Sequence, residues 1–244
     1  MNSQRLLNEQ HRWFNSTAGQ YLQVKEQALY DKAVVDLFGF NALQMGYLQL
    51  DLLCNSRIPN RFRASESNVA AQNNHLCCDD DFLPFAAESL DLLLLPHRLE
   101  FSSRPHQTLR EAERVVMHEG YLLISGFNPF SIWGMVAGVK RLFSANKAYP
   151  WSGSFIGLAR MKDWLALMGF EVVSVEVTCC IPPFERASWY KHCIFMDNLR
   201  ATMFGGIYFI VAKKRVACMT PVRPLWKSAA LASHLIPRPA KKNR

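Results

Sequence analysis

The stretch Leu90-Asp91-Leu92-Leu93-Leu94-Leu95, residues 90–95, decides the fold class of this chain. An apolar run of this length, bounded by turn residues, is typical of a strand buried on both faces at the centre of a parallel sheet. Residues 105–117 follow as an amphipathic helix, with Ser102 or Ser103 near its cap. Residues 121–125 then predict a second buried strand, so strand and helix alternate in this region.

The same alternation extends to both sides of this centre. Upstream, Thr17 and Gln20 fit a capping box that opens a helix of about residues 18–38. The first buried strand is predicted at residues 40–46, and a rival register makes residues 33–37 the strand instead. The remaining predicted elements are strands at residues 75–78, 171–178 and 207–212 and a helix at residues 158–168. Such alternation predicts an α/β fold with a parallel sheet and right-handed crossovers.

The basic residues of the chain are unevenly distributed. The chain has 244 residues and a formal net charge of +8, and nine of its 28 basic residues lie in residues 213–244, which contain no acidic residue. We therefore predict one domain over residues 1–219 and a basic extension over residues 220–244. Such an extension either stays solvated or binds nucleic acid or an anionic surface.

Several classes of protein find no support in the sequence. The amino-terminal residues lack the apolar segment of a secretory signal. The uncharged run at residues 120–139 contains four glycines and Pro129, which favours a strand followed by a loop over a membrane helix. The seven cysteines form neither a disulfide framework nor a C-x-x-C pair. We expect a cytoplasmic protein with reduced thiols and no metal site.

Ligands of open α/β sheets bind beyond the carboxyl ends of the strands, so the residues that follow each strand are the candidates for a site. His97 and His106 are the histidines best placed for a general base, although a structural role is the alternative for both. Asn128-Pro129-Phe130 is best interpreted as a turn. Four aromatic residues would line an apolar acceptor pocket or belong to the core: Phe127, Phe130, Trp133 and Trp151.

Four short segments in the middle of the chain match the order and spacing of motifs in a known protein family. They are Asp79-Asp80-Asp81-Phe82-Leu83-Pro84-Phe85, Leu99-Glu100-Phe101, Leu109-Arg110-Glu111-Ala112-Glu113-Arg114-Val115 and Glu119-Gly120-Tyr121. Their order and spacing resemble the central half of the class I S-adenosylmethionine-dependent methyltransferases, type 11 subfamily. The resemblance covers about residues 75–126. It implies a Rossmann-like, seven-stranded, mostly parallel sheet with helices on both faces and an antiparallel last strand.

The resemblance further implies S-adenosylmethionine as the cofactor and assigns residues to it. Gly46 would lie beside its methionyl part, and Pro96 and His97 would lie near the methyl group. Asp79 would meet the adenine amino group, and Asp80 would supply a neighbouring backbone amide.

The glycine-rich cofactor loop of that family is degenerate in this chain. Gln44, Leu48 and Leu50 stand where the family has an acidic residue and two glycines. Glycines in such a loop let the backbone approach a ligand closely and adopt positive φ.

Two functions are therefore compared. The first is methyl transfer to a small-molecule acceptor, in which the protein aligns the reactants and needs no essential acid or base, with His97 as the one candidate catalytic residue. The second, favoured by the missing glycines, is a catalytically inactive binding or regulatory module, in contact with nucleic acid if the basic extension binds it.

Overall fold

A computed structural model describes residues 3–47, 49–65, 75–143, 149–178 and 205–215 of the chain. Over these residues the chain forms a seven-stranded sheet in the order β3-β2-β1-β4-β5-β7-β6. The strands are β1 (Asn41–Met45), β2 (Asn60–Ser65), β3 (His75–Cys77), β4 (Leu90–Pro96), β5 (Val116–Phe127), β6 (Phe170–Thr178) and β7 (Ile207–Lys214). The first five strands pair in parallel, and β7 runs antiparallel to both β5 and β6. The predicted fold class is thus confirmed.

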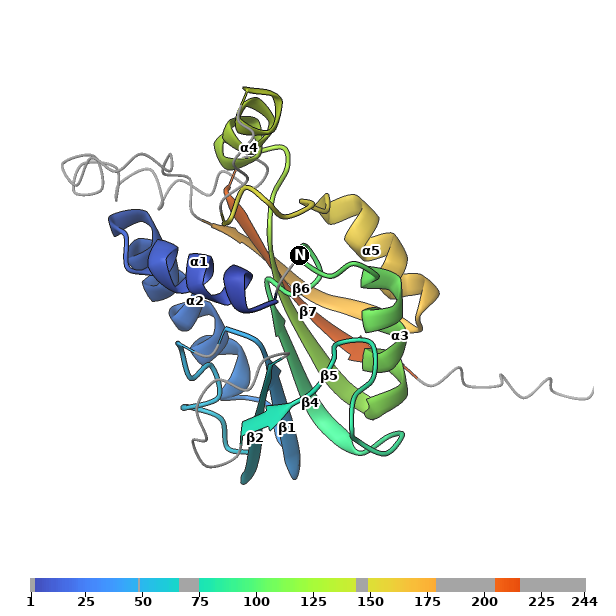
Figure 1. Ribbon diagram of the computed structural model, residues 1–244. Helices are drawn as coiled ribbons and strands as arrows, with labels where there is room; N and C mark the ends of the chain where they lie inside the picture. The colour runs from blue at the N-terminus through green and yellow to red at the C-terminus, as the bar shows by residue number, and fades with distance from the viewer. Residues whose placement is uncertain (1–2, 48, 66–74, 144–148, 179–204, 216–244) are drawn as a thin grey trace, which may run out of the picture.

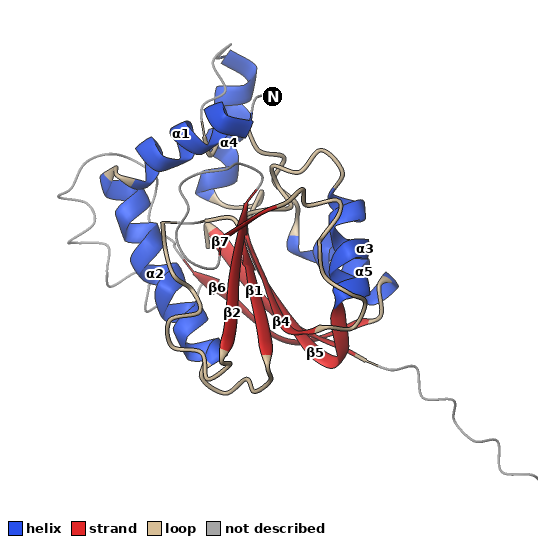
Figure 2. Ribbon diagram, turned by 60° about the horizontal axis from the view of Figure 1, so that its bottom comes forward, coloured by secondary structure: helices blue, strands red, loops and turns tan. Residues whose placement is uncertain are grey.

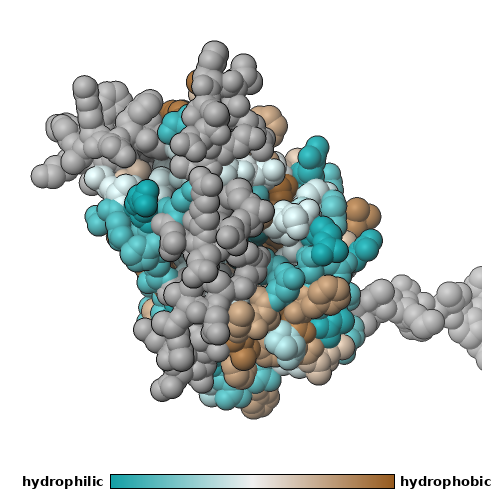
Figure 3. Space-filling model, in the orientation of Figure 1, coloured by the Kyte–Doolittle hydropathy of each residue, from teal (hydrophilic) through white to brown (hydrophobic). Residues whose placement is uncertain are grey.

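Helices cover both faces of the sheet. The helices are α1 (Ser3–Phe14), α2 (Thr17–Val34), α3 (Pro105–Val115), α4 (Ile132–Phe143) and α5 (Leu158–Leu167). Figures 1 and 2 show α1 and α2 on one face, α3 and α5 on the other, and α4 beyond the carboxyl end of β5. Hydrophilic side chains lie along α2, at the left of the surface in Figure 3. The arrangement is a three-layer α/β/α fold, which leaves the carboxyl ends of the parallel strands under α1 and α4.

Strand β4 lies at the centre of the sheet because nearly all of its side chains are apolar. Leu92 and Leu94 point into the hydrophobic core beneath α2, and Leu93 and Leu95 point into the core beneath α3 and α5. This alternation is what a strand buried on both faces requires, and it confirms the interpretation of residues 90–95.

The start of α2 differs from the predicted capping box. Ser16, not Thr17, is the N-cap residue, and its hydroxyl accepts a hydrogen bond from the amide of Gly19. The rival register for the first strand is wrong, because residues 33–34 end this helix and β1 begins at Asn41. Neither Ser102 nor Ser103 caps α3, where Arg104 is the N-cap residue and no side chain accepts the capping bond.

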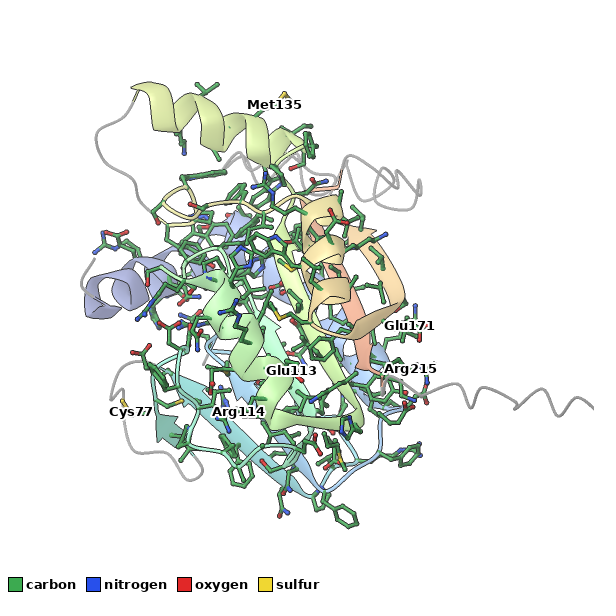
Figure 4. The ribbon with its side chains drawn as sticks, turned by 90° about the vertical axis from the view of Figure 1, so that its right-hand side faces the viewer. Cys77, Glu113, Arg114, Met135, Glu171 and Arg215 are labelled. Atoms are coloured by element: carbon green, nitrogen blue, oxygen red, sulfur yellow. The ribbon has the colours of Figure 1, made fainter. Side chains whose placement is uncertain are left out.

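Three elements lie where the sequence predicted none: α1, β2 and α4. The uncharged run at residues 120–139 does begin with a strand, β5, but it continues into α4 rather than into a loop. Met135 of α4 points outward at the top of the molecule (Figure 4). None of the helices in the described residues is long and apolar enough to cross a membrane. The basic extension at residues 220–244 lies outside the described residues.

Candidate functional site

The loop after β1 is held in shape by Gln44. Its side-chain nitrogen donates to the carbonyl oxygens of Gly46, Tyr47 and Leu50 at 3.2, 3.2 and 2.9 Å, and its side-chain oxygen accepts from the amide of Leu52 at 3.0 Å. Two residues of this loop have positive φ, Gly46 at 73° and Tyr47 at 54°. The side chain at the position of the family's acidic residue therefore organises the loop.

The three consecutive aspartates after β3 have different surroundings. Asp79 is exposed, whereas Asp80 and Asp81 are buried. Asp80 accepts hydrogen bonds from the guanidinium of Arg98, and Asp81 pairs with Arg104 at 2.8 Å. Two arginines thus relieve the repulsion that three neighbouring carboxylates would otherwise cause.

Arg98 brings the ends of three strands together. It follows β4, its Nε donates to the carboxylate of Asp80 at 2.8 Å, and its Cδ would lie only 2.7 Å from a Cβ atom placed on Gly46. The loops after β1, β3 and β4 therefore meet at one point. Gly46, Asp80 and His97, which the sequence grouped as candidates, do lie on these converging segments. Arg98 was not among the candidate residues predicted from the sequence.

His97 is buried between two carboxylates. Its Nε2 lies 2.8 Å from Glu26 of α2, and its Nδ1 lies 3.0 Å from Glu100. The backbone of His97 is left-handed, with φ of 49°, a conformation that few residues other than glycine adopt. Burial lowers the pKa of His97, but Glu26 and Glu100 outweigh it and raise the pKa to about 10. Nδ1 is hydrogen-bonded to Glu100 and Nε2 faces the carboxylate of Glu26, so His97 is held as an imidazolium ion between two negative charges and is not available as a base.

Glu100 also connects the end of β4 to the end of β5. Its second carboxylate oxygen accepts a hydrogen bond from the backbone amide of Phe127. The ring of Phe127 lies against His97, with 4.2 Å between ring centroids. Tyr30 of α2 donates to Ser125 at 3.2 Å in the same buried layer. The carboxyl ends of β4 and β5 are thereby fixed to α2.

The four aromatic candidates separate into core and surface. Phe127 and Trp133 are fully buried and stacked on each other, Trp151 is 9% exposed, and Phe130 is 75% exposed. A cavity of about 150 Å³ lies beside this cluster, and Trp151 and Phe155 contribute its aromatic walls. Its other lining residues are Pro129, Gly134, Ala137, Gly138 and Gly153. Of the four residues, only Trp151 lines this space.

Two further predictions concern residues near this region. Asn128 does form a turn, because its side-chain oxygen accepts from the amide of Phe130 at 3.1 Å. His106 lies on α3 against Trp164, with 3.9 Å between ring centroids, and not beside His97. In the part of the chain that the structure describes, no three His, Cys, Asp or Glu residues are arranged to hold a metal ion.

Two comparisons concern the sequence of the chain. A family profile described as a methyltransferase domain matches residues 45–124. The uncharacterized protein YafS of Escherichia coli K12 is 34% identical over 186 residues, which are 75% of this chain and 72% of that protein.

Solved structures share the fold at low sequence identity. One is a Thermotoga maritima protein described as an S-adenosylmethionine-dependent methyltransferase and possible histamine N-methyltransferase, with a TM-score of 0.61, 20% identity and coverage of 86% of this chain and 97% of that one. Another is the magnesium protoporphyrin IX methyltransferase of Synechocystis with bound S-adenosylhomocysteine, with a TM-score of 0.55, 13% identity and coverage of 86% and 94%.

Proposed function

The chain belongs to the S-adenosylmethionine-dependent methyltransferase family of class I fold, and we propose that it transfers a methyl group from S-adenosylmethionine to a small, largely apolar acceptor. The observation that carries this proposal is the convergence of the loops after β1, β3 and β4 at Arg98. In open α/β sheets this edge is where ligands bind.

The residue types at this edge of the sheet are suited to binding S-adenosylmethionine. Gly46 offers a backbone without a Cβ atom, and the atom nearest to that missing Cβ belongs to the side chain of Arg98 rather than to the backbone. Asp79 is an exposed carboxylate at the end of β3, suited to an amino group such as that of adenine. We propose that Gly46, Asp79, the amide of Asp80, Pro96 and His97 hold the cofactor.

Bound there, S-adenosylmethionine supplies a methyl group on a cationic sulfur. The residues of this chain would align the two reactants and exclude water, because methyl transfer of this kind depends mainly on these two effects. Phe127, Trp133 and Tyr149 form part of a buried aromatic layer over the strand ends and keep solvent out. His97 would act by positioning, since both of its nitrogens are engaged.

We place the acceptor in the cavity lined by Trp151 and Phe155. Its lining residues carry no charge, which suits an apolar or aromatic molecule. Phe155 stacks on Phe127 at 5.0 Å, and Phe127 contacts His97 at 4.2 Å. The cavity is therefore one aromatic ring away from the residue that we assign to the donor site.

Calorimetric titration of the full chain tests the donor site. We expect micromolar binding of S-adenosylmethionine and of S-adenosylhomocysteine. Absence of binding at millimolar concentration would contradict methyl transfer.

One observation favours the inactive module as a second candidate. Tyr47, which follows Gly46 in the cofactor loop, is only 2% exposed and packs against Phe14 of α1 with 4.5 Å between ring centroids. A packed ring in this loop leaves less room for a ligand than the glycines of the family do. The same titration distinguishes the two candidates, because the module would bind neither compound.

We also propose that the basic residues 220–244 bind an anionic partner such as nucleic acid. The composition supports this, because Lys241, Lys242 and Arg244 are part of a segment without acidic residues. Affinity for a DNA duplex should fall steeply between about 50 and 200 mM salt and disappear when residues 220–244 are deleted. Salt-independent binding, or binding that survives the deletion, would contradict this proposal.

A further inference from the structure

Three ionisable side chains meet in the interior at the carboxyl end of β4. We call Glu26, His97 and Glu100 the buried charge cluster. Glu26 comes from α2, and His97 and Glu100 come from the segment after β4. All three side chains are at most 1% exposed, and His97 is within 3.0 Å of a carboxylate on either side.

The buried charge cluster carries more negative than positive charge. His97 lies between the two carboxylates and carries a single positive charge, so it balances only one of them. Burial alone would raise the pKa of Glu26, but His97 and neighbouring hydroxyl groups lower it by more. The pKa is therefore below its usual value, and Glu26 stays ionised. The other groups that lower the pKa of Glu26 are the neutral hydroxyls of Ser125 and Tyr47, and neither oxygen of Glu26 has a hydrogen bond of good geometry within the described residues. Within the described ranges, no lysine or arginine bonds to either carboxylate.

An uncompensated charge in the interior is expensive unless a partner of opposite sign binds beside it. The position of the cluster indicates where that partner would be. Tyr47, directly after Gly46, interacts with Glu26, and its ring lies 6.3 Å from that of His97. The excess negative charge therefore lies behind the loop after β1 and the end of β4, which are the two segments assigned to the methionyl and methyl parts of the donor.

We propose that the buried charge cluster is the counter-charge of the donor's sulfonium, and that Glu26 and Glu100 are the residues that make the site prefer a cationic ligand over a neutral one. This inference rests on the proposed function. It also gives a physical reason for the neutral Gln44 at the end of β1. The carboxylate missing from that strand is replaced by one on α2, so the site keeps a negative charge while Gln44 is free to hold the loop.

Three commercial ligands separate charge from shape. S-adenosylmethionine and sinefungin carry a positive charge at or beside the sulfur position, and S-adenosylhomocysteine has a neutral thioether there. We would measure the dissociation constants of all three for the wild-type chain, Glu26→Gln and Glu100→Gln. Glutamine keeps the size of the side chain and removes its charge.

The expected result is a change in ligand preference rather than in overall affinity. Affinity for the two cationic ligands should fall on the order of tenfold in each variant, relative to S-adenosylhomocysteine, because each substitution removes one buried negative charge. Glu26→Asp, which keeps the charge, should retain most of the wild-type preference. Glu111→Gln is the control, because Glu111 is a buried carboxylate bound to Arg114 on α3 and should leave the preference unchanged.

The possible outcomes are distinct. If all three ligands bind and the ratio of affinities is the same in wild type, Glu26→Gln and Glu100→Gln, the inference is overturned and the proposed function stands. If both variants weaken all three ligands equally, the cluster is structural only and the inference is again overturned. If the wild-type chain binds none of the ligands, the proposed function fails and the inference fails with it. Should one variant not fold, the other removes the same unit of charge and gives the same readout.

Discussion

The side-chain nitrogen of Gln44 lies 2.9 Å from the carbonyl oxygen of Leu50, and this bond is one of four that its amide group makes within the loop after β1. Only a side chain that both donates and accepts can make this set. A carboxylate at the same position would accept from Leu52 but could not donate to the three carbonyl groups.

Gln44→Glu should therefore destabilise the protein by about 3 kcal/mol, since it buries a charge and leaves carbonyl groups unsatisfied. Urea denaturation followed by circular dichroism measures the change. Gln20→Glu, on the exposed face of α2, is the matched control and should stay close to wild type. Equal stability of Gln44→Glu and wild type would contradict the role assigned to Gln44.

The stability of the fold should decrease at alkaline pH because of His97. Its pKa in the folded protein is about 10, above the usual value of 6.5. The stabilisation by protonated His97 is therefore complete below pH 6.5 and is lost as the pH rises through about 10. The free energy of unfolding, measured between these two values, should fall in wild type.

Glu26→Gln is the comparison for this pH dependence. It removes one of the two carboxylates that keep His97 protonated, so His97 should lose its proton at lower pH and the alkaline decline should shrink. An equal decline in wild type and variant would assign the effect to other groups.

Gly46→Ala should weaken cofactor binding. The added Cβ would lie 2.7 Å from Cδ of Arg98, and the positive φ of 73° strains alanine by about 1–2 kcal/mol. Gly169→Ala supplies the control, because Gly169 also has positive φ and nothing lies within 4 Å of its missing Cβ. Titration calorimetry should show at least about tenfold weaker binding of S-adenosylhomocysteine for Gly46→Ala only. Equal affinity of both variants for S-adenosylhomocysteine would contradict the assignment of Gly46 to the cofactor site.

Lys214 should contribute to stability far more than its neighbour Lys213. The ammonium group of Lys214 is buried and donates to the carbonyl oxygens of Glu113 and Val116 at 2.6 and 3.0 Å, at the carboxyl end of α3. Lys214→Met should cost about 1–3 kcal/mol because it leaves these carbonyl groups without donors. Thermal unfolding measures the difference.

Lys213→Met is the matched control for this experiment. Lys213 pairs with the half-exposed Glu119, and pairs of this kind add little to stability. Arg215 and Glu171 form a similar exposed pair beyond the end of β7, where they lie side by side in Figure 4. Equal losses for the two lysine variants would contradict the capping role of Lys214.

The sequence predicted the centre of the fold well because its elements have strong patterns. The apolar run of β4 and the amphipathic α3 each fit one interpretation. Strand β2 was missed because Arg61 and Arg63 make it look polar, although both guanidinium groups bind carbonyl oxygens of the preceding loop. Helix α4 was missed because Gly134 and Gly138 are typical of a loop.

The candidate site was only partly predictable. Gly46, Asp80 and His97 were grouped by the resemblance to the methyltransferase family, which agrees with the rule that ligands bind beyond the carboxyl ends of parallel strands. Glu26 and Arg98 were not predicted, because the residues that they contact are distant in the sequence. A glutamate within a polar helix gives no sign that it is buried against a histidine after β4.

Glu26 has a consequence for the evolution of this family. It precedes residues 45–124, the part of the chain that matches the family profile. Relatives that lack an acid at the end of the first strand should therefore have acquired a carboxylate in the preceding helix, and the two positions should covary among aligned sequences. Subfamilies would then be distinguished by which of the two segments carries the acid.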